Sequence, residues 1–172
     1  IWASTFHSTC SRILRYHADR IGYTKHFTIY DTDDSKRLIK DCQKKLNIDD
    51  KLIPYKSVMS EISRAKDNLI EPKEYEKCAG GDFRLGKIAE IYDIYQKELI
   101  KADAMDFDDL LYNTVLLFKK CPDVLEQYQN KFRYILVDEY QDTNHVQYVF
   151  ISMLADKYRN LCVVGDDDQS IY

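Results

Sequence analysis

The sequence predicts a mostly helical chain with a small parallel α/β portion towards its C-terminus. Between about residues 8 and 130, apolar side chains recur at helical spacing, and capping residues or proline stand where helices would begin. Beyond residue 130, two short apolar runs flank one helical segment. Strand, helix and strand in this order are typical of a parallel sheet, and strands that are apolar throughout indicate burial on both faces.

The N-terminal part predicts a strand end followed by a helix. Ile1 to Phe6 is short, apolar and β-favouring, and is expected to be the end of a strand that runs into a helix near Ser8. One face of this helix would carry Ile13, Leu14, His17 and Ile21. Gly22 is its predicted end.

Five further helices are predicted in the middle of the chain. The first helix follows the cap-rich DTDDS, and the second follows Pro54 and ends before Pro72. The third begins near Asp82. The last two span Phe107–Phe118 and Asp123–Gln129. The first of the five would turn Ile39, Cys42 and Leu46 inward. The acidic cluster Asp106, Asp108 and Asp109 is interpreted as a capped helix start, because apolar residues stand among the carboxylates at helical spacing.

The α/β portion consists of two predicted strands and the helix between them. Tyr134–Val137 stops at Asp138-Glu139, the helix covers Val146–Leu154, and the second strand stops at Gly165-Asp166. Two strands are too few to form a covered sheet. The rest of the sheet is therefore expected to be missing or to come from other parts of the protein.

Composition places the chain among ordinary globular proteins. It has 172 residues, of which 45% are hydrophobic and 31% charged. Five scattered cysteines without a CxxC pair do not predict a zinc site and favour a reducing, cytoplasmic setting. No apolar run approaches the roughly 20 residues that cross a bilayer, so no membrane partner is predicted. The chain lacks an initiator Met and is expected to be part of a longer protein.

Charge is unevenly distributed along the chain. The net charge of −4 argues against a globally basic nucleic-acid binder. Residues 12–105 nevertheless carry 19 Lys/Arg against 17 Asp/Glu, while the remainder carries 6 against 12. Within the first portion, one helical face gathers Lys36, Arg37, Lys40 and Lys44. This face is either a phosphate contact or a solvated surface, and the solvated surface is the commoner case.

Carboxylates follow both predicted strands. The first strand leads into VDEYQDTN and the second lies within VVGDDDQSIY. In open parallel sheets, ligands bind just beyond the carboxyl ends of the strands. An Asp-Glu pair there suits phosphoryl transfer, because one carboxylate can hold Mg²⁺ and the next can orient or deprotonate the attacking water. A neighbouring Gln169 can sense the γ-phosphate by hydrogen bonding.

These motifs resemble the UvrD/Rep/PcrA family of superfamily 1 DNA helicases over essentially the whole chain. The stretches that carry the resemblance are TFHSTCSRILR (Thr5–Arg15), MDFDDLL (Met105–Leu111), FRYILVDEYQDTNHVQY (Phe132–Tyr148) and VVGDDDQSIY. The resemblance implies an incomplete RecA-like motor domain of the P-loop NTPase type. Its motor portion would be residues 1–11 and 106–172, and residues 12–105 would be a helical insert like the family's subdomain 1B.

The resemblance also implies roles for residues at the nucleotide. Asp138 would be the Mg²⁺ carboxylate, and Glu139 the base for the attacking water. Gln169 would contact the γ-phosphate and couple hydrolysis to movement. Gln141 and Asp142 complete the first motif and would link the nucleotide to the DNA-facing loops.

A second group of residues is implied to contact DNA. Thr5, Phe6 and His7 match a segment that lies along the single strand. Tyr172 begins an aromatic stretch on which bases stack, each stack contributing roughly 1–3 kcal/mol. The family's insert approaches duplex DNA, which favours phosphate contacts for Lys36, Lys40 and Lys44.

One family feature is missing from the chain. No Gly-rich GxxxxGK[ST] loop, which would cradle the ATP phosphates, occurs in it. In the family this loop would lie before Ile1, and the second motor domain after Tyr172. The chain alone is therefore expected neither to hydrolyse ATP nor to unwind DNA, and neither Mg²⁺ nor ATP is expected to bind it alone.

The predicted function is a part of an ATP-dependent 3′–5′ DNA helicase or translocase of DNA repair or replication. It would use Mg²⁺ and ATP in the full-length protein. Its partners would be single-stranded DNA, single-strand/duplex junctions and the rest of the helicase chain, and the exposed sheet edge can form a dimer. Two alternatives remain open: a stand-alone DNA- or protein-binding helical module, and a fragment of a RecB/AddA-type nuclease-helicase.

Overall fold

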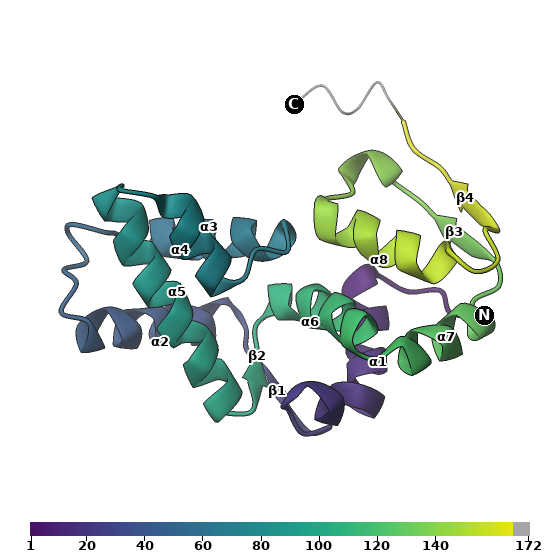
Figure 1. The fold of residues 1–172 in the computed structure, drawn as a ribbon, viewed down its shortest axis with the longest axis horizontal. Helices are drawn as coiled ribbons and strands as arrows, with labels where there is room; N and C mark the ends of the chain where they lie inside the picture. Colours follow the sequence, from purple (N-terminus) through teal and green to yellow (C-terminus); the bar gives the residue numbers. More distant parts are fainter. Residues whose placement is uncertain (167–172) are drawn as a thin grey trace.

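Two separate hydrophobic cores divide the molecule, and Figure 1 shows them as two lobes side by side. The computed structural model describes residues 1–166. The core of the first lobe draws its buried side chains from residues 10–27 and 105–154. The core of the second lobe draws them from residues 39–104. The predicted residues Gln169 and Tyr172 lie outside the described part.

The first lobe begins with α1 (Phe6–His17), which is continued by the 3-10 turn η1 (Ala18–Ile21). Thr5 caps α1 by accepting the N–H of Ser8, and Gly22 ends the turn with a left-handed φ of 94° that glycine adopts readily. The predicted end at Gly22 is confirmed. The predicted strand before α1 is wrong: residues 1–5 are not a strand, and they pair with none in the described chain.

Three helices complete the first lobe, all near their predicted positions. They are α6 (Phe107–Lys120), α7 (Pro122–Lys131) and α8 (His145–Ala155). Helix α6 runs through the centre of the lobe and packs against α1, α7 and α8. Its Phe118 stacks on Phe150 of α8 with ring centroids 6.0 Å apart. Helix α6 is therefore the element around which this core forms.

The second lobe is built from four helices. They are α2 (Thr32–Lys45), α3 (Tyr55–Asp67), α4 (Pro72–Ala79) and α5 (Phe83–Lys101). Helix α4 is not among the predicted helices, because Pro72 indicates only the end of the preceding helix in the sequence pattern. Proline is equally suited to the first position of a new helix, and Pro72 occupies it.

No helix in the described part of the chain is long and apolar enough to cross a membrane.

Two very short strands form the junction between the lobes. Strand β1 (Thr28–Ile29) pairs in parallel with β2 (Ala104–Met105). The predicted boundary after residue 11 falls inside α1, and the buried side chains on either side of it, Cys10 and Ile13, share the first core. By packing, therefore, the chain passes between the lobes at β1 and β2.

The predicted strands near the C-terminus form a second parallel pair. Strand β3 (Ile135–Val137) pairs with β4 (Leu161–Val163), with Ile135 opposite Leu161. Ile135 packs against the first core and Val137 is buried, whereas Leu136 between them is 71% exposed. Burial on both faces is thus not reached within the described residues, because no element of that part covers the Leu136 side.

A buried ion cluster joins the lobes. The Lys66 ammonium on α3 lies 2.6 Å from Asp106 Oδ2 and 2.9 Å from Asp109 Oδ1, and the Lys66 side chain has no solvent exposure. Asp106 caps α6 in a reciprocal capping box with Asp109, which confirms the interpretation of the acidic cluster as a capped helix start. The hydroxyl of Tyr95 on α5 also donates to Asp106 Oδ2, at 2.8 Å.

Burial and the crowding of charges set the ionisation of this cluster. Burial opposes the charge on Lys66, but the neighbouring carboxylates raise its pKa above the usual value. Burial likewise opposes the charge on Asp106, yet Lys66 holds the pKa of Asp106 below the usual value. Burial and then the charge of Asp106 raise the pKa of Asp109 to about 7. One ammonium therefore fully compensates only one of the two carboxylates.

Lys66→Met is expected to lower the free energy of unfolding by about 3–5 kcal/mol, because it leaves two buried carboxylates without their cation. Lys56→Met on the exposed side of α3 is the matched control and is expected to change it by no more than about 0.5 kcal/mol. Urea unfolding followed by circular dichroism measures both. Equal effects of the two substitutions would contradict a stabilising role for the buried cluster.

Candidate functional site

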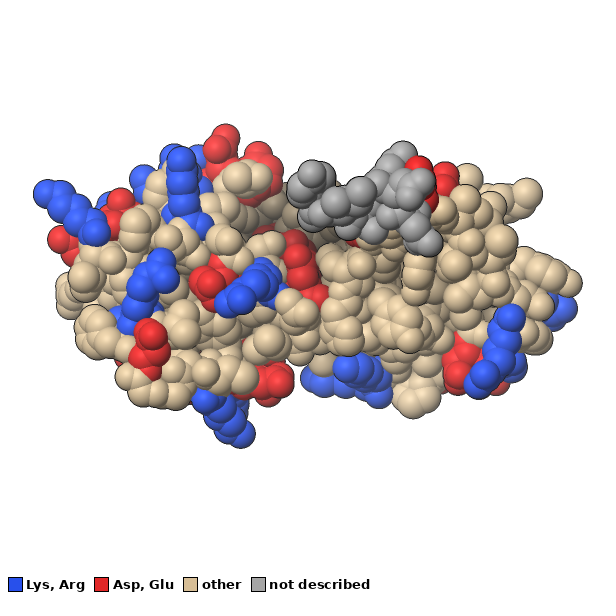
Figure 2. All heavy atoms as spheres, turned by 90° about the horizontal axis from the view of Figure 1, so that it is seen from above, with Lys and Arg blue, Asp and Glu red and all other residues tan. Residues whose placement is uncertain are grey.

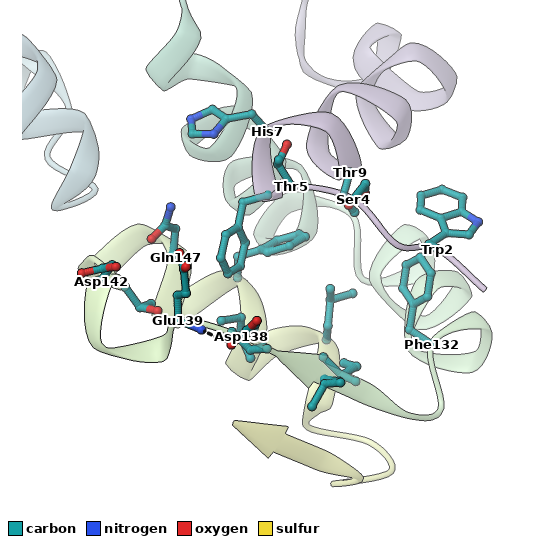
Figure 3. Close-up of a pocket in the computed structure, with 18 of the residues that line it drawn as sticks. Trp2, Ser4, Thr5, His7, Thr9, Phe132, Asp138, Glu139, Asp142 and Gln147 are labelled. Carbon is teal, nitrogen blue, oxygen red and sulfur yellow. Dashed lines mark hydrogen bonds between the residues drawn. The ribbon is translucent and has the colours of Figure 1, made fainter. Parts of the chain in front are cut away.

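Two successive carboxylates follow β3 at its carboxyl end. Asp138 comes directly after Val137, and its Oδ1 accepts the N–H of Glu139 at 2.8 Å, the dashed contact in Figure 3. Glu139 has a left-handed φ of 51°, which non-glycine residues rarely adopt and which costs on the order of 1 kcal/mol or more. This conformation turns the chain into the 3-10 turn η2 (Tyr140–Asp142). The acidic pair is thus held on a sharp bend at the edge of the sheet.

The loops after β3 and β4 are bonded to each other. The N–H of Tyr140 donates to the carbonyl of Val164 at 3.0 Å. Oε1 of Gln141 accepts the N–H of Asp166 at 3.1 Å. A Cβ at Gly165 would stand only 2.7 Å from Gln141 Oε1, so a larger residue there would displace the Gln141 side-chain amide from its present position. Gln141 therefore connects the two sequence motifs directly.

A cavity of about 600 Å³ lies beside the acidic bend. Its lining includes Asp138, Glu139 and Asp142 from the first motif, together with the segment 5–7 at the start of α1. Figure 3 shows these two groups on opposite sides of the same pocket. The structure thus brings together two sets of predicted residues that are more than 130 positions apart in sequence. Gln141 is not among the residues that line the cavity.

His7 occupies one rim of this pocket and has an aromatic partner. Its ring stacks on Phe107 with centroids 4.2 Å apart and an interplanar angle of 21°. Half-burial of His7 lowers its pKa below the usual value. Phe107, the first residue of α6, remains 56% exposed. Phe107 does not line the cavity, and the sequence did not single it out as a partner of His7, although an aromatic side chain among the capping aspartates of a first turn is a signal for an exposed position.

The predicted basic residues Lys36, Lys40 and Lys44 lie elsewhere. They belong to α2, which Figure 1 places in the second lobe, away from β3. The ammonium groups of Lys36 and Lys40 lie 4.8 and 4.7 Å from the ring centroid of Tyr55. On the face drawn in Figure 2, basic and acidic side chains are interspersed over this lobe. The lysines therefore form a surface separate from the pocket.

The acidic bend suits a magnesium–phosphate complex better than a metal cage built by protein alone. Within residues 1–166, no three His, Cys, Asp or Glu side chains form a group able to hold a metal ion. Mg²⁺ in phosphoryl-transfer sites is usually bound by one or two carboxylates, with phosphate oxygens and water completing its shell. Asp138, oriented by the Glu139 N–H, fits that single-carboxylate arrangement.

Comparisons with known proteins cover the whole chain. Residues 1–172 match the family described as the UvrD/REP helicase N-terminal domain. Over 172 residues the chain is 51% identical to the ATP-dependent DNA helicase PcrA of Bacillus subtilis, and 52% identical to the PcrA proteins of Staphylococcus epidermidis and Staphylococcus aureus. These matches include 100% of this chain but only 23–24% of the relatives, so the chain spans about a quarter of their length. The resemblance inferred from the sequence motifs is confirmed.

Gly165→Ala is expected to destabilise the protein by about 0.5–1.5 kcal/mol, because the new methyl group would displace Gln141 Oε1 from the Asp166 N–H. Adding Gln141→Ala removes that atom and should restore part of the loss, which a double-mutant cycle in urea measures. Gly86→Ala is the matched control, because a Cβ there meets nothing within 4 Å. Additive effects of the Gly165 and Gln141 substitutions would contradict the contact between the loops.

Proposed function

The chain belongs to the UvrD/REP helicase N-terminal domain family, and from that membership we propose that it is part of an ATP-dependent DNA helicase that moves 3′ to 5′ along single-stranded DNA. The pocket beside β3 carries the proposal. It gathers Asp138, Glu139 and the segment 5–7 around one cavity. Residues suited to ATP hydrolysis and residues implied to contact DNA thus line the same cavity. The PcrA names of the relatives favour this branch over the nuclease-helicases.

The acidic bend would provide the chemistry of hydrolysis. Asp138 would hold Mg²⁺, which when bound supplies charge stabilisation to the ATP phosphates. Glu139, next in the chain, would orient the attacking water and accept its proton. The hydrogen bond from the Glu139 N–H fixes the Asp138 carboxylate before any ligand binds. The two functions are therefore assigned to two carboxylates on one bend.

Three further residues would couple the bound nucleotide to movement of the protein along DNA. Gln141 holds the loop after β4 through the N–H of Asp166, and Asp142 lines the cavity. The loop after β4 leads to Gln169, which we assign to the γ-phosphate. A change at the phosphate would then reach η2 through the contact between the two loops.

DNA would contact both lobes. Thr5, Phe6 and His7 would lie along the single strand, and Tyr172 would offer a stacking surface to a base. Lys36, Lys40 and Lys44 in the second lobe would contact phosphates of a duplex at the junction with the single strand. Binding through lysines to phosphates weakens as salt rises, because counterions compete for the DNA.

The chain alone is expected to show no Mg²⁺-dependent ATP hydrolysis, with or without single-stranded DNA, because it lacks a GxxxxGK[ST] loop. A phosphate-release assay measures this. DNA-stimulated turnover that disappears in Glu139→Gln would contradict the expectation. Light scattering on the same sample reports whether the exposed β3–β4 pair associates with a second copy or stays monomeric.

Glu139→Gln is expected to lower kcat for DNA-stimulated ATP hydrolysis by about 10²–10⁴-fold when this chain replaces the matching segment of a PcrA relative, because the water loses its base. Glu76→Gln on the exposed face of α4 is the matched control and should leave kcat unchanged. The binding of single-stranded DNA, measured by fluorescence anisotropy, should be kept in both variants. A folded chimera in which Glu139→Gln hydrolyses ATP normally would overturn the role of Glu139.

A further inference from the structure

The first turn of α6 is held by side chains from the second lobe. Lys66 on α3 pairs with Asp106 and Asp109, at 2.6 and 2.9 Å. From α5, Tyr95 donates to Asp106 Oδ2 at 2.8 Å and Gln96 donates to Asp109 Oδ1 at 3.3 Å. The two carboxylates of the capping box of α6 are therefore bound by side chains from the lobe to which α6 does not belong.

The same turn reaches the pocket in the first lobe. Phe107 stands between Asp106 and Asp108, and its ring covers one face of His7 at 4.2 Å. Phe107 does not itself line the cavity beside Asp138, but His7 on α1 does, so the turn reaches the pocket only through His7. An unbroken set of direct contacts thus runs from Lys66 through the capping aspartates and Phe107 to His7.

Lys66 supplies the positive charge in this series of contacts, and no other residue of the series can supply it. Asp106 and Asp109 exchange capping-box hydrogen bonds of 2.8 and 3.1 Å, which bring two buried carboxylates together. Like charges this close repel each other unless a cation lies between them. Among the described residues, Lys66 is the cation that forms ion pairs with both carboxylates.

We propose that Lys66 is a positioning residue that sets the placement of Phe107 and His7 at the pocket relative to the second lobe. Displacement of the second lobe would then move the first turn of α6 and change the cover over His7. In its consequence for DNA, this inference rests on the proposed function. The geometric part, that Lys66 controls the surroundings of His7, holds for the chain itself.

The test is a pH titration of the four histidine rings by NMR, in the chain as it stands and in Lys66→Met. In Lys66→Met, loss of the Phe107 cover should raise the pKa of His7 towards its usual 6.5 and change the ring-current shift of its Hε1 proton. Lys56→Met, also on α3 but exposed, should leave both unchanged. A folded Lys66→Met chain with the His7 titration and shift of the wild type would overturn the proposal.

Asp109→Asn keeps the inference testable if Lys66→Met does not fold. It retains the Lys66–Asp106 pair and removes the other carboxylate, so Lys66 loses one of its two ion pairs. Its His7 pKa should rise in the same direction by a smaller amount. A folded Asp109→Asn chain with an unchanged His7 resonance would overturn the proposal as well.

A DNA-binding measurement distinguishes a failure of this inference from a failure of the proposed function. The probe is a fluorescent oligothymidylate, titrated at fixed salt into the PcrA chimera with and without Lys66→Met. The substitution should weaken binding by about tenfold, as for one lost aromatic–base stack, while Lys56→Met has no effect. No binding by the unsubstituted chimera would count against the proposed function. Normal DNA binding by Lys66→Met, together with an altered His7 titration, would overturn only the DNA consequence of the inference.

Discussion

The buried ammonium of Lys66 is the interaction on which the arrangement of the two lobes depends. Removing one ammonium and two carboxylates from water costs several kcal/mol per ion, so such a cluster persists only if nearly every polar atom finds a partner. Tyr95, Gln96 and the capping box supply those partners. The docking is therefore specific: a small shift between the lobes would leave buried charges unpaired. Hydrophobic contacts alone would allow one lobe to slide against the other, because they are not directional.

Helix α6 transmits this constraint to the site. Its first turn is fixed by the second lobe, while the rest of it packs against α1, α7 and α8. Helix α1 starts at the pocket with segment 5–7, and α8 connects the two strands whose ends carry the acidic motifs. One rigid helix thus relates the DNA-implied segment, the carboxylates and the second lobe to one another. A site built from segments so distant in sequence needs such a common support.

Local signals predicted the helices and the acidic bend, and they failed where long-range contacts decide. Caps and periodicity located α1, α2 and α5, and the strand-end carboxylates located Asp138 and Glu139. Lys66 is separated from Asp106 by 40 residues, and a lysine within a polar helix gives no sign of complete burial. The β1–β2 pair has only two residues per strand, too few for any periodicity. The close approach of Gly165 to Gln141 likewise appears only once the register of β3 and β4 places the two loops side by side.

The acidic bend and the sheet that carries it differ in whether they need contacts from other parts of the protein. Among the described residues, three hydrogen bonds that shape the bend are made within the two motifs: Asp138 with the Glu139 N–H, Tyr140 with Val164, and Gln141 with Asp166. The sheet, by contrast, exposes Leu136 and all of β4 within the described residues. Preorganised carboxylates stabilise developing charge most effectively when no reorganisation is needed at the moment of reaction. Motif-internal bonds supply that preorganisation, whereas burial of the strands needs additional cover. The geometry of the acidic bend can therefore be set by residues 137–166 even where the stability of the sheet is not.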